Sequence, residues 1–350
     1  MKKSVKVKII GRDWVNWSID KDRKNLCSFL SDLKGVKLSS SYIFSDIYFF
    51  VWYEQVFSLK FFFVRLLKKF FHKKIVAVIT NDCRDDINKI NHFKGLVDLF
   101  IAPSQAVSDF LTANNWPNIK IPFYVSPAEF YRLSLTKLAL CERLKIDYSL
   151  VKDKILIGSF QRDSLGKNLL LPKWQKNPDL LVKILSGLPR EKFILILAGP
   201  RRHYLVKECE RQSIPYIFVG ESQCFAAGKD DVLVNNLSIE KINWLYNLID
   251  LYLVTSASEG GPKAILESSL CQTMIFSTPV GLAPDFLHPF SLFDSGDYSK
   301  ISEYILNCFD GKMKQTEYIK YNFEKVLSVM ENNHYQDLII NIFFKLNIIL

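Results

Sequence analysis

Residues 250 to 267 read Asp250-Leu-Tyr-Leu-Val-Thr-Ser-Ala-Ser-Glu-Gly-Gly-Pro-Lys-Ala-Ile-Leu-Glu267, and they decide the fold of this chain. Leu251 to Thr255 is a short apolar and β-branched run without helical spacing, which predicts a buried strand. Ser258 to Gly261 predicts a turn, and a helix then begins at about Pro262, whose missing N–H is harmless at a first helical position. Thr273 to Ser277 predicts the next strand. Such a unit predicts a right-handed crossover between parallel strands, with its loop at the ligand-binding edge of the sheet.

The loop and the helix start offer two kinds of ligand contact. Gly260 and Gly261 let a ligand approach the backbone, and the unpaired N–H groups of a first helical turn favour an anion. Glu259 and Glu267 are carboxylates, which accept hydrogen bonds from sugar hydroxyls. At a rise of about 1.5 Å per residue, Glu267 lies roughly 7 to 8 Å along the axis from Pro262 and reaches a different part of an extended ligand. A nucleotide sugar has both groups and that shape.

These residues resemble a known signature. Glu259 and Glu267, with seven residues between them, precede a small-residue strand and Pro279-Val-Gly281, and this pattern resembles the E-x7-E motif of retaining GT-B glycosyltransferases. The similarity is to glycosyltransferase family 4, the group 1 glycosyltransferases. It implies an α/β fold of two Rossmann-like parallel-sheet domains that face a cleft, with a C-terminal helix that crosses back to the first domain. The alternative is an ordinary βαβ unit with two incidental glutamates.

The resemblance also implies roles for the residues of the motif. Glu259 contacts the donor sugar, and Glu267 contacts the ribose. Gly260 and Gly261 present backbone N–H groups to the sugar or the phosphate, and Pro262 completes this donor-binding loop.

A diphosphate clamp is implied upstream of the motif. Arg162 follows a predicted strand at 155–158, and Lys176 precedes a predicted helix, with Lys173 as an alternative to Lys176. A guanidinium and an ammonium suit this position because they neutralise the charge that builds on a departing nucleotide. Arg201 and Arg202, after a predicted strand at 193–198, are either nucleotide contacts or, as we expect, exposed surface charge.

The acceptor side is less defined. Asn16 and Trp17 lie in a loop after the predicted strand Val5–Ile10, where they contact an acceptor or simply pack. Asp82 follows the predicted strand 75–80, at a place where many relatives carry a histidine, and is the candidate to take the proton of the acceptor. Its acidic neighbours favour a solvated turn over a metal site, and the resemblance implies no metal and no other cofactor.

One segment, 55–74, predicts a membrane contact. Its apolar and aromatic residues follow helical spacing on one side, and its basic residues fall on the other side. A basic amphipathic helix of this kind is typical of a contact with an anionic membrane surface. The alternative is a helix packed on the core with a solvated basic face.

Composition bounds the rest. A chain of 350 residues predicts more than one domain, and we expect an acceptor-side domain over 1–145, a nucleotide-sugar domain over 146–332 and a helix over 333–350 that packs back on the first domain. Seven cysteines without a CxxC pair predict neither a disulfide framework nor a zinc site. No apolar run reaches the roughly eighteen residues of a membrane span. A net charge of +10 predicts an anionic partner.

The sequence therefore predicts a retaining hexosyltransferase that moves a sugar from a nucleoside-diphosphate sugar to a hydroxyl acceptor, which is lipid-linked if the membrane contact holds. We expect it in the cytoplasm, peripheral on the inner face of the cell membrane, in synthesis of a bacterial cell-surface polysaccharide or glycolipid. The alternative is a non-catalytic nucleotide-sugar-binding scaffold at the membrane. Nucleic acid is not an expected partner, because no recognition motif accompanies the basic residues.

Overall fold

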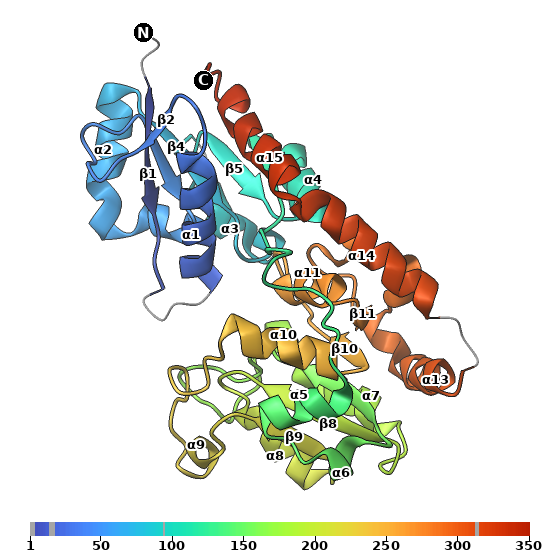
Figure 1. Ribbon diagram of the computed structural model, residues 1–350. Helices are drawn as coiled ribbons and strands as arrows, with labels where there is room; N and C mark the ends of the chain where they lie inside the picture. The colour runs from blue at the N-terminus through green and yellow to red at the C-terminus, as the bar shows by residue number, and fades with distance from the viewer. Residues whose placement is uncertain (1–3, 14–17, 94, 312–314) are drawn as a thin grey trace. The chain divides into compact units, whose positions relative to one another are not determined.

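The computed structural model describes residues 4–13, 18–93, 95–311 and 315–350. The chain divides into two compact units, each with its own parallel sheet (Figure 1). Unit 1 comprises residues 1–124 and 330–350, and unit 2 comprises residues 125–329.

The sheet of unit 1 has six parallel strands in the order β2-β1-β3-β4-β5-β6. All residues of β3 and β5 are buried, as expected for central strands of a sheet that is covered on both faces. The strands are β1 (Val5–Ile10), β2 (Val36–Leu38), β3 (Ile47–Phe50), β4 (Lys74–Val78), β5 (Leu99–Ala102) and β6 (Asn118–Lys120).

The helices of unit 1 come from both ends of the chain. They are α1 (Ser18–Ser31), α2 (Phe62–Phe71), α3 (Ile87–Asn91), α4 (Gln105–Ala113) and α15 (Asn332–Lys345). The C-terminal helix α15, red in Figure 1, packs on unit 1 through Tyr335. The ring of Tyr335 lies 5.0 Å from that of Phe29 of α1, and its hydroxyl donates to the carbonyl of Pro122 at 2.7 Å. The last helix thus belongs to the compact unit that contains the first strand.

The sheet of unit 2 has five parallel strands in the order β11-β10-β7-β8-β9. Every residue of β8, β10 and β11 is buried, and these continuous apolar runs are typical of parallel strands with helices on both faces. The strands are β7 (Ile155–Ser159), β8 (Phe193–Ala198), β9 (Tyr216–Val219), β10 (Leu251–Val254) and β11 (Met274–Ser277).

The helices of unit 2 pack around this sheet. They are α5 (Lys137–Leu144), α6 (Tyr148–Val151), α7 (Pro178–Ser186), α8 (His203–Arg211), α9 (Gln223–Ala226), α10 (Ile239–Leu248), α11 (Lys263–Leu270), α12 (Ala283–Phe286), α13 (Tyr298–Phe309) and α14 (Thr316–Met330). The helix α11 begins one residue later than the sequence predicts, because Pro262 takes the N-cap position with an extended backbone.

The division between the units lies earlier than the expected boundary at residue 145. Residues 125–145 join unit 2 because their polar groups bond there. The ammonium of Lys137 donates to Asp250 at 2.6 Å, and the N–H of Leu133 donates to the side chain of Asn247 at 2.8 Å.

The segment 55–74 differs from the single helix that its spacing predicts. Two short 3-10 turns, η1 (Tyr53–Phe57) and η2 (Leu59–Phe61), precede α2, which spans only Phe62–Phe71. Within α2, Val64 and Leu67 are the buried residues, so the helix rests on unit 1 by a narrow face. In the part of the chain that the structure describes, no helix is long and apolar enough to cross a bilayer.

Candidate functional site

The candidate site lies where the strand order of unit 2 reverses. From β7 the chain moves to β8 and β9 on one side, and then returns to β10 and β11 on the other side. Ligands of open parallel sheets bind beyond the carboxyl ends of the strands at such a point. Arg162 follows β7, Glu259 follows β10, and Arg201 follows β8, so adjacent strand ends carry all three.

Glu259 is held between a lysine and a serine. The ammonium of Lys176 donates to Oε1 of Glu259, and the hydroxyl of Ser256 donates to the same oxygen at 2.8 Å. The side chains of Lys176 and Glu259 are only 17% and 13% exposed. Main-chain bonds fix the two loops to each other, since the carbonyl of Gln175 accepts the N–H of Ala257 at 2.9 Å. The η4 turn (Trp174–Lys176) therefore sets the position of Lys176 beside the E-x7-E loop.

Further basic side chains surround this pair. Burial, followed by repulsion from Arg162 and Lys176, lowers the pKa of Lys173 to about 8. Burial, followed by repulsion from Arg201, lowers the pKa of Arg162, and Glu259 acts in the opposite direction. The three cations predicted from sequence thus share one electrostatic environment with Glu259. Positive charge gathered in a partly buried place favours an anionic ligand.

Arg201 and Arg202 are not exposed surface charges, so that expectation is wrong. Arg201 pairs with Asp230 at 2.6 Å, and its side chain is 18% exposed. Its guanidinium lies against the backbone of Gly166, where an added Cβ would come within 2.7 Å of Nη1. Arg202 is fully buried. Composition alone predicts that a basic dipeptide after a strand is exposed. In the structure, Asp230 and Gly166 contact Arg201 and Asp163 contacts Arg202, so neither arginine is exposed.

A buried ion pair, Arg202 with Asp163, lies next to the cationic cluster in the chain. Nε of Arg202 lies 3.1 Å from Oδ2 of Asp163, and the two side chains are 0% and 2% exposed. The backbone of Asp163 accepts the N–H of Lys173 at 2.6 Å and donates to the carbonyl of Arg201 at 3.1 Å. Asp163 also directly follows Arg162 in the chain. One residue therefore connects the three segments that carry Arg162, Lys173 and Arg201, and sequence reasoning missed it.

Glu267 lies in different surroundings from Glu259. Oε2 of Glu267 accepts a hydrogen bond from the hydroxyl of Tyr246 at 2.9 Å. Tyr246 is buried in α10, where its ring lies 5.2 Å from those of Phe160 and Tyr252, and burial raises its pKa well above the ordinary value. The phenol therefore stays protonated and holds the carboxylate of this half-buried glutamate. Nothing in the sequence of α10 singles out Tyr246.

Gly281 explains why the motif ends in Pro279-Val-Gly281. Its φ of +53° is one that L residues rarely adopt. A Cβ at Gly281 would lie 2.9 Å from the carbonyl oxygen of Glu259 and 3.0 Å from that of Gly260. The loop that contains Glu259, Gly260, Gly261 and Pro262 thus keeps its place because this residue has no side chain.

The acceptor-side candidates lie in unit 1. Asn16 and Trp17 fall outside the residues that the structure describes. Asp82 follows β4 and caps the η3 turn (Cys83–Asp86) by accepting from the N–H of Arg84 at 3.0 Å. The guanidinium of Arg84 also donates to the same carboxylate at 2.6 Å and 2.9 Å. The role of Asp82 toward an acceptor stays a prediction.

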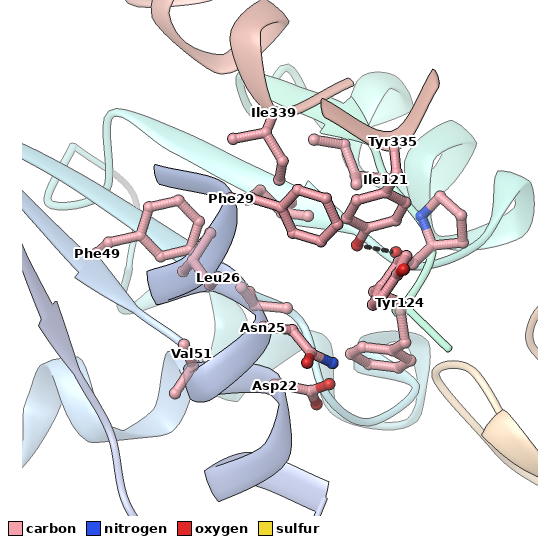
Figure 2. A pocket seen from close by; sticks show the side chains of 14 residues that line it. Asp22, Asn25, Leu26, Phe29, Phe49, Val51, Ile121, Tyr124, Tyr335 and Ile339 are labelled. Carbon is pink, nitrogen blue, oxygen red and sulfur yellow. Dashed lines mark hydrogen bonds between the residues drawn. The ribbon is translucent and has the colours of Figure 1, made fainter. Parts of the chain in front are cut away.

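A small apolar cavity of about 50 Å³ opens at the carboxyl ends of the strands in unit 1. Figure 2 shows Asp22 and Asn25 of α1 on one side of it, with Phe29 and Tyr335 among the rings that line it. Pockets for whole ligands usually measure about 300 to 1,000 Å³. The cavity therefore has room for a small apolar group only. Among the described residues, no group of three or more His, Cys, Asp or Glu is arranged to hold a metal ion.

Part of unit 2 matches a family model. Residues 171–325 match the model of the group 1 glycosyl transferases. This segment holds Lys173, Lys176, Glu259 and Glu267, and Arg162 lies just before it. No curated protein matches the chain.

Solved structures share the fold of the whole chain. The crystal structure of HepE from Anabaena, in complex with UDP and glucose, matches with a TM-score of 0.69 at 14% identity and covers 97% of this chain and 99% of that chain. Sucrose-phosphate synthase from Thermosynechococcus elongatus matches with a TM-score of 0.66 at 13% identity, over 87% of this chain and 74% of that chain. With two parallel-sheet units, the chain has the GT-B fold that the sequence predicted. The family match and this fold together support a GT-B glycosyltransferase.

Proposed function

We propose that the protein is a retaining glycosyltransferase of family 4 that transfers a hexose-type sugar from a nucleoside-diphosphate sugar to a hydroxyl acceptor. The observation that carries this proposal is the cluster of Arg162, Lys173 and Lys176 around Glu259 at the switch point of unit 2, with Arg201 near Arg162 and Lys173. Three cations near one partly buried carboxylate suit a ligand with two phosphates and a hydroxyl-bearing sugar. HepE was crystallised with UDP-glucose, which makes UDP-sugars the first donors to test.

When the donor binds, Lys176 and Glu259 each exchange the other for a group of the donor. Lys176 is paired with Glu259 in the structure. A bound diphosphate competes for the ammonium of Lys176, and Oε1 of Glu259 is then released to accept a hydrogen bond from a sugar hydroxyl. As the glycosidic bond breaks, charge grows on the diphosphate, and Arg162 and Lys176 stabilise it more strongly than they stabilise the intact donor. The acceptor attacks on the face that the leaving group departs from, and no side-chain nucleophile or metal is part of the proposal.

The two glutamates are expected to differ when each is replaced. Glu259→Gln removes the charge that neutralises Lys176, so we expect lower kcat with unchanged or tighter binding of a sugar-free nucleoside diphosphate. Glu267→Gln weakens a contact to the ribose, so it should weaken binding of the same nucleotide. Kinetics on a confirmed donor and calorimetry with the diphosphate separate these effects. Equal loss of nucleotide affinity in both variants would contradict the assignment.

Lys173 is expected to make nucleotide binding depend on pH. With a pKa of about 8, Lys173 loses its proton above that pH in the ligand-free protein. A diphosphate favours the charged form and raises this pKa, so binding takes up a proton between pH 8 and the ordinary lysine value of 10.5. Affinity should fall by up to about tenfold per pH unit in that window. Calorimetry in buffers of different ionisation enthalpy measures the uptake, and Lys173→Gln should abolish it; uptake that persists in this variant rules out Lys173 as its source.

Retention is tested by the anomeric configuration of the product. From an α-linked donor, proton NMR of the first product should show an α-linkage, and a β-linkage would show inversion.

We further propose that the protein acts in the cytoplasm in synthesis of a bacterial cell-surface polysaccharide or glycolipid. A protein that binds the donor but neither hydrolyses nor transfers its sugar, with any hydroxyl acceptor offered, is instead a non-catalytic scaffold.

A further inference from the structure

The outer face of α2 exposes an unusual amount of aromatic surface. Phe62, Phe63, Phe70 and Phe71 are between 50% and 66% exposed, and Leu59, just before the helix, is 88% exposed. Exposed apolar residues are ordinary when they are scattered, but a contiguous set marks an interaction surface. Five such residues lie within thirteen positions of a single short segment.

Basic side chains lie among these rings. The guanidinium of Arg65 is 5.3 Å from the ring centre of Phe62, and the ammonium of Lys69 is 5.9 Å from that of Phe70. Such contacts are weakly attractive at a surface. They place positive charge at the same level as the aromatic rings, which is the arrangement of a segment that enters the headgroup region of a bilayer.

A basic hollow adjoins the rings. It has a volume of about 540 Å³ and is lined by Arg65, Leu66, Lys68, Lys69, His72, Lys73, Lys74, Gly95, Leu96 and Asp98. Five of these side chains are lysine or arginine and one is aspartate, so the lining carries an excess of four positive charges with histidine neutral. Asp98 is already engaged, because it binds Lys68 and accepts from the N–H of Ile75 at 2.7 Å. An anionic group in the hollow therefore meets a positive environment.

We propose that this face is a docking site for anionic phospholipid, in which the hollow binds a phosphate headgroup while the phenylalanines of α2 and Leu59 enter the acyl boundary. The positive charge of the hollow favours an anionic lipid. The adjacent exposed rings favour a bilayer over free phosphate as the ligand, because free phosphate offers no apolar surface for them to contact. Lys74 is the first residue of β4 and Asp98 directly precedes β5, so the hollow lies at the amino ends of these strands, away from the carboxyl-end cavity of Figure 2. The site goes beyond the proposed transfer reaction and does not depend on it.

Co-sedimentation of the full chain with phosphatidylglycerol–phosphatidylcholine vesicles tests the proposal. The wild type should pellet at low salt, and added salt should release it. Lys69→Gln with Lys73→Gln should weaken binding about thirtyfold, at about 1 kcal/mol for each basic residue near the surface. Phe70→Ser with Phe71→Ser should weaken binding at least as much, because each ring removes apolar area worth about tenfold or more.

Matched controls lie elsewhere on the chain. Phe344→Ser removes a ring that is 64% exposed on α15, close to the 66% of Phe70, and should leave binding unchanged. Lys320→Gln with Lys325→Gln removes two exposed charges from α14 and should do the same. Thermal unfolding of each variant checks that it folds.

The proposal is overturned if wild type does not pellet with anionic vesicles, if it binds pure phosphatidylcholine equally well, or if millimolar inorganic phosphate at constant ionic strength releases it. The last result would make the hollow a site for free phosphate. A single-stranded oligonucleotide that displaces the vesicles at equal phosphate concentration would likewise reassign the face to nucleic acid.

Discussion

Arg162→Ala and Lys176→Ala should each lower kcat/KM on a confirmed donor by roughly thirty- to a thousandfold. Each change removes a charge-assisted contact that strengthens as the leaving group ionises, and such contacts contribute about 2 to 4 kcal/mol to the barrier. Because Lys176 also neutralises Glu259, its loss leaves a partly buried carboxylate without its cation. We therefore expect the Lys176 variant to be affected in donor binding as well as in turnover.

Arg211→Ala is the matched control for this experiment. Arg211 lies on the same unit, in α8, but its side chain is 63% exposed and pairs with Glu208 one turn away. Initial rates of this variant, measured at saturating and at subsaturating donor, should lie within twofold of the wild-type rates. Near-wild-type kinetics for both Arg162→Ala and Lys176→Ala would show that the diphosphate does not bind between them.

Arg202→Met should destabilise the protein by about 3 to 5 kcal/mol, the largest stability effect that we expect from a single change in unit 2. It leaves the buried carboxylate of Asp163 without its partner, and an uncompensated buried charge has a cost of that order. Replacing both partners, as Asp163→Leu with Arg202→Met, should be less damaging than Arg202→Met alone, because no buried charge is then left.

Urea unfolding followed by tryptophan fluorescence measures both variants. If Arg202→Met lowers the free energy of unfolding by less than about 1 kcal/mol, the pair is not buried as the structure has it. Since the carboxylate of Asp163 also accepts from the hydroxyl of Ser164 at 2.8 Å and from the N–H of Leu205 at 3.3 Å, the double variant should also bind nucleotide less well even if its stability recovers.

The local structure around Glu259 was predictable because its signals are close together in the sequence. The strand, loop and helix around Glu259 have turn and capping signals within twenty residues, and each signal agrees with the others. Arg162 and Lys176 are implied by the resemblance, through their positions after a strand and before a helix. The structure brings them together with Glu259 because β7 and β10 are neighbours in the sheet.

The supporting residues were not predictable because their partners are distant in the chain. Asp163 meets Arg202 across 39 positions, and Tyr246 meets Glu267 across 21. A single aspartate or tyrosine has no local pattern that announces such a partner. For Arg202, residue type even predicts an exposed side chain, since arginine is rarely buried without a specific partner.

The segment around α2 shows a different limit. Its spacing predicts that aromatic and basic residues lie on opposite sides of one helix, but Arg65 and Lys69 lie beside the rings of Phe62 and Phe70. Spacing alone also does not say which side of a helix is covered. Here Val64 and Leu67 face the core of unit 1, and most of the phenylalanines are left exposed. The predicted apolar face is therefore a surface, which is the physical basis of the docking site proposed above.

The most direct test of the donor site is calorimetric titration of a panel of nucleoside diphosphates into wild type, Arg162→Ala, Lys176→Ala and Arg211→Ala. At least one diphosphate should bind wild type and Arg211→Ala equally, and binding should weaken at least thirtyfold in Arg162→Ala, at about 2 kcal/mol for a lost charge-assisted contact. The same ligand should raise the unfolding temperature of wild type, since a ligand at a hundred times its Kd adds about 2.7 kcal/mol of stability. If no diphosphate binds wild type, or if the bound one is held equally well by Arg162→Ala and Lys176→Ala, the cationic cluster of unit 2 is not a nucleotide-sugar site.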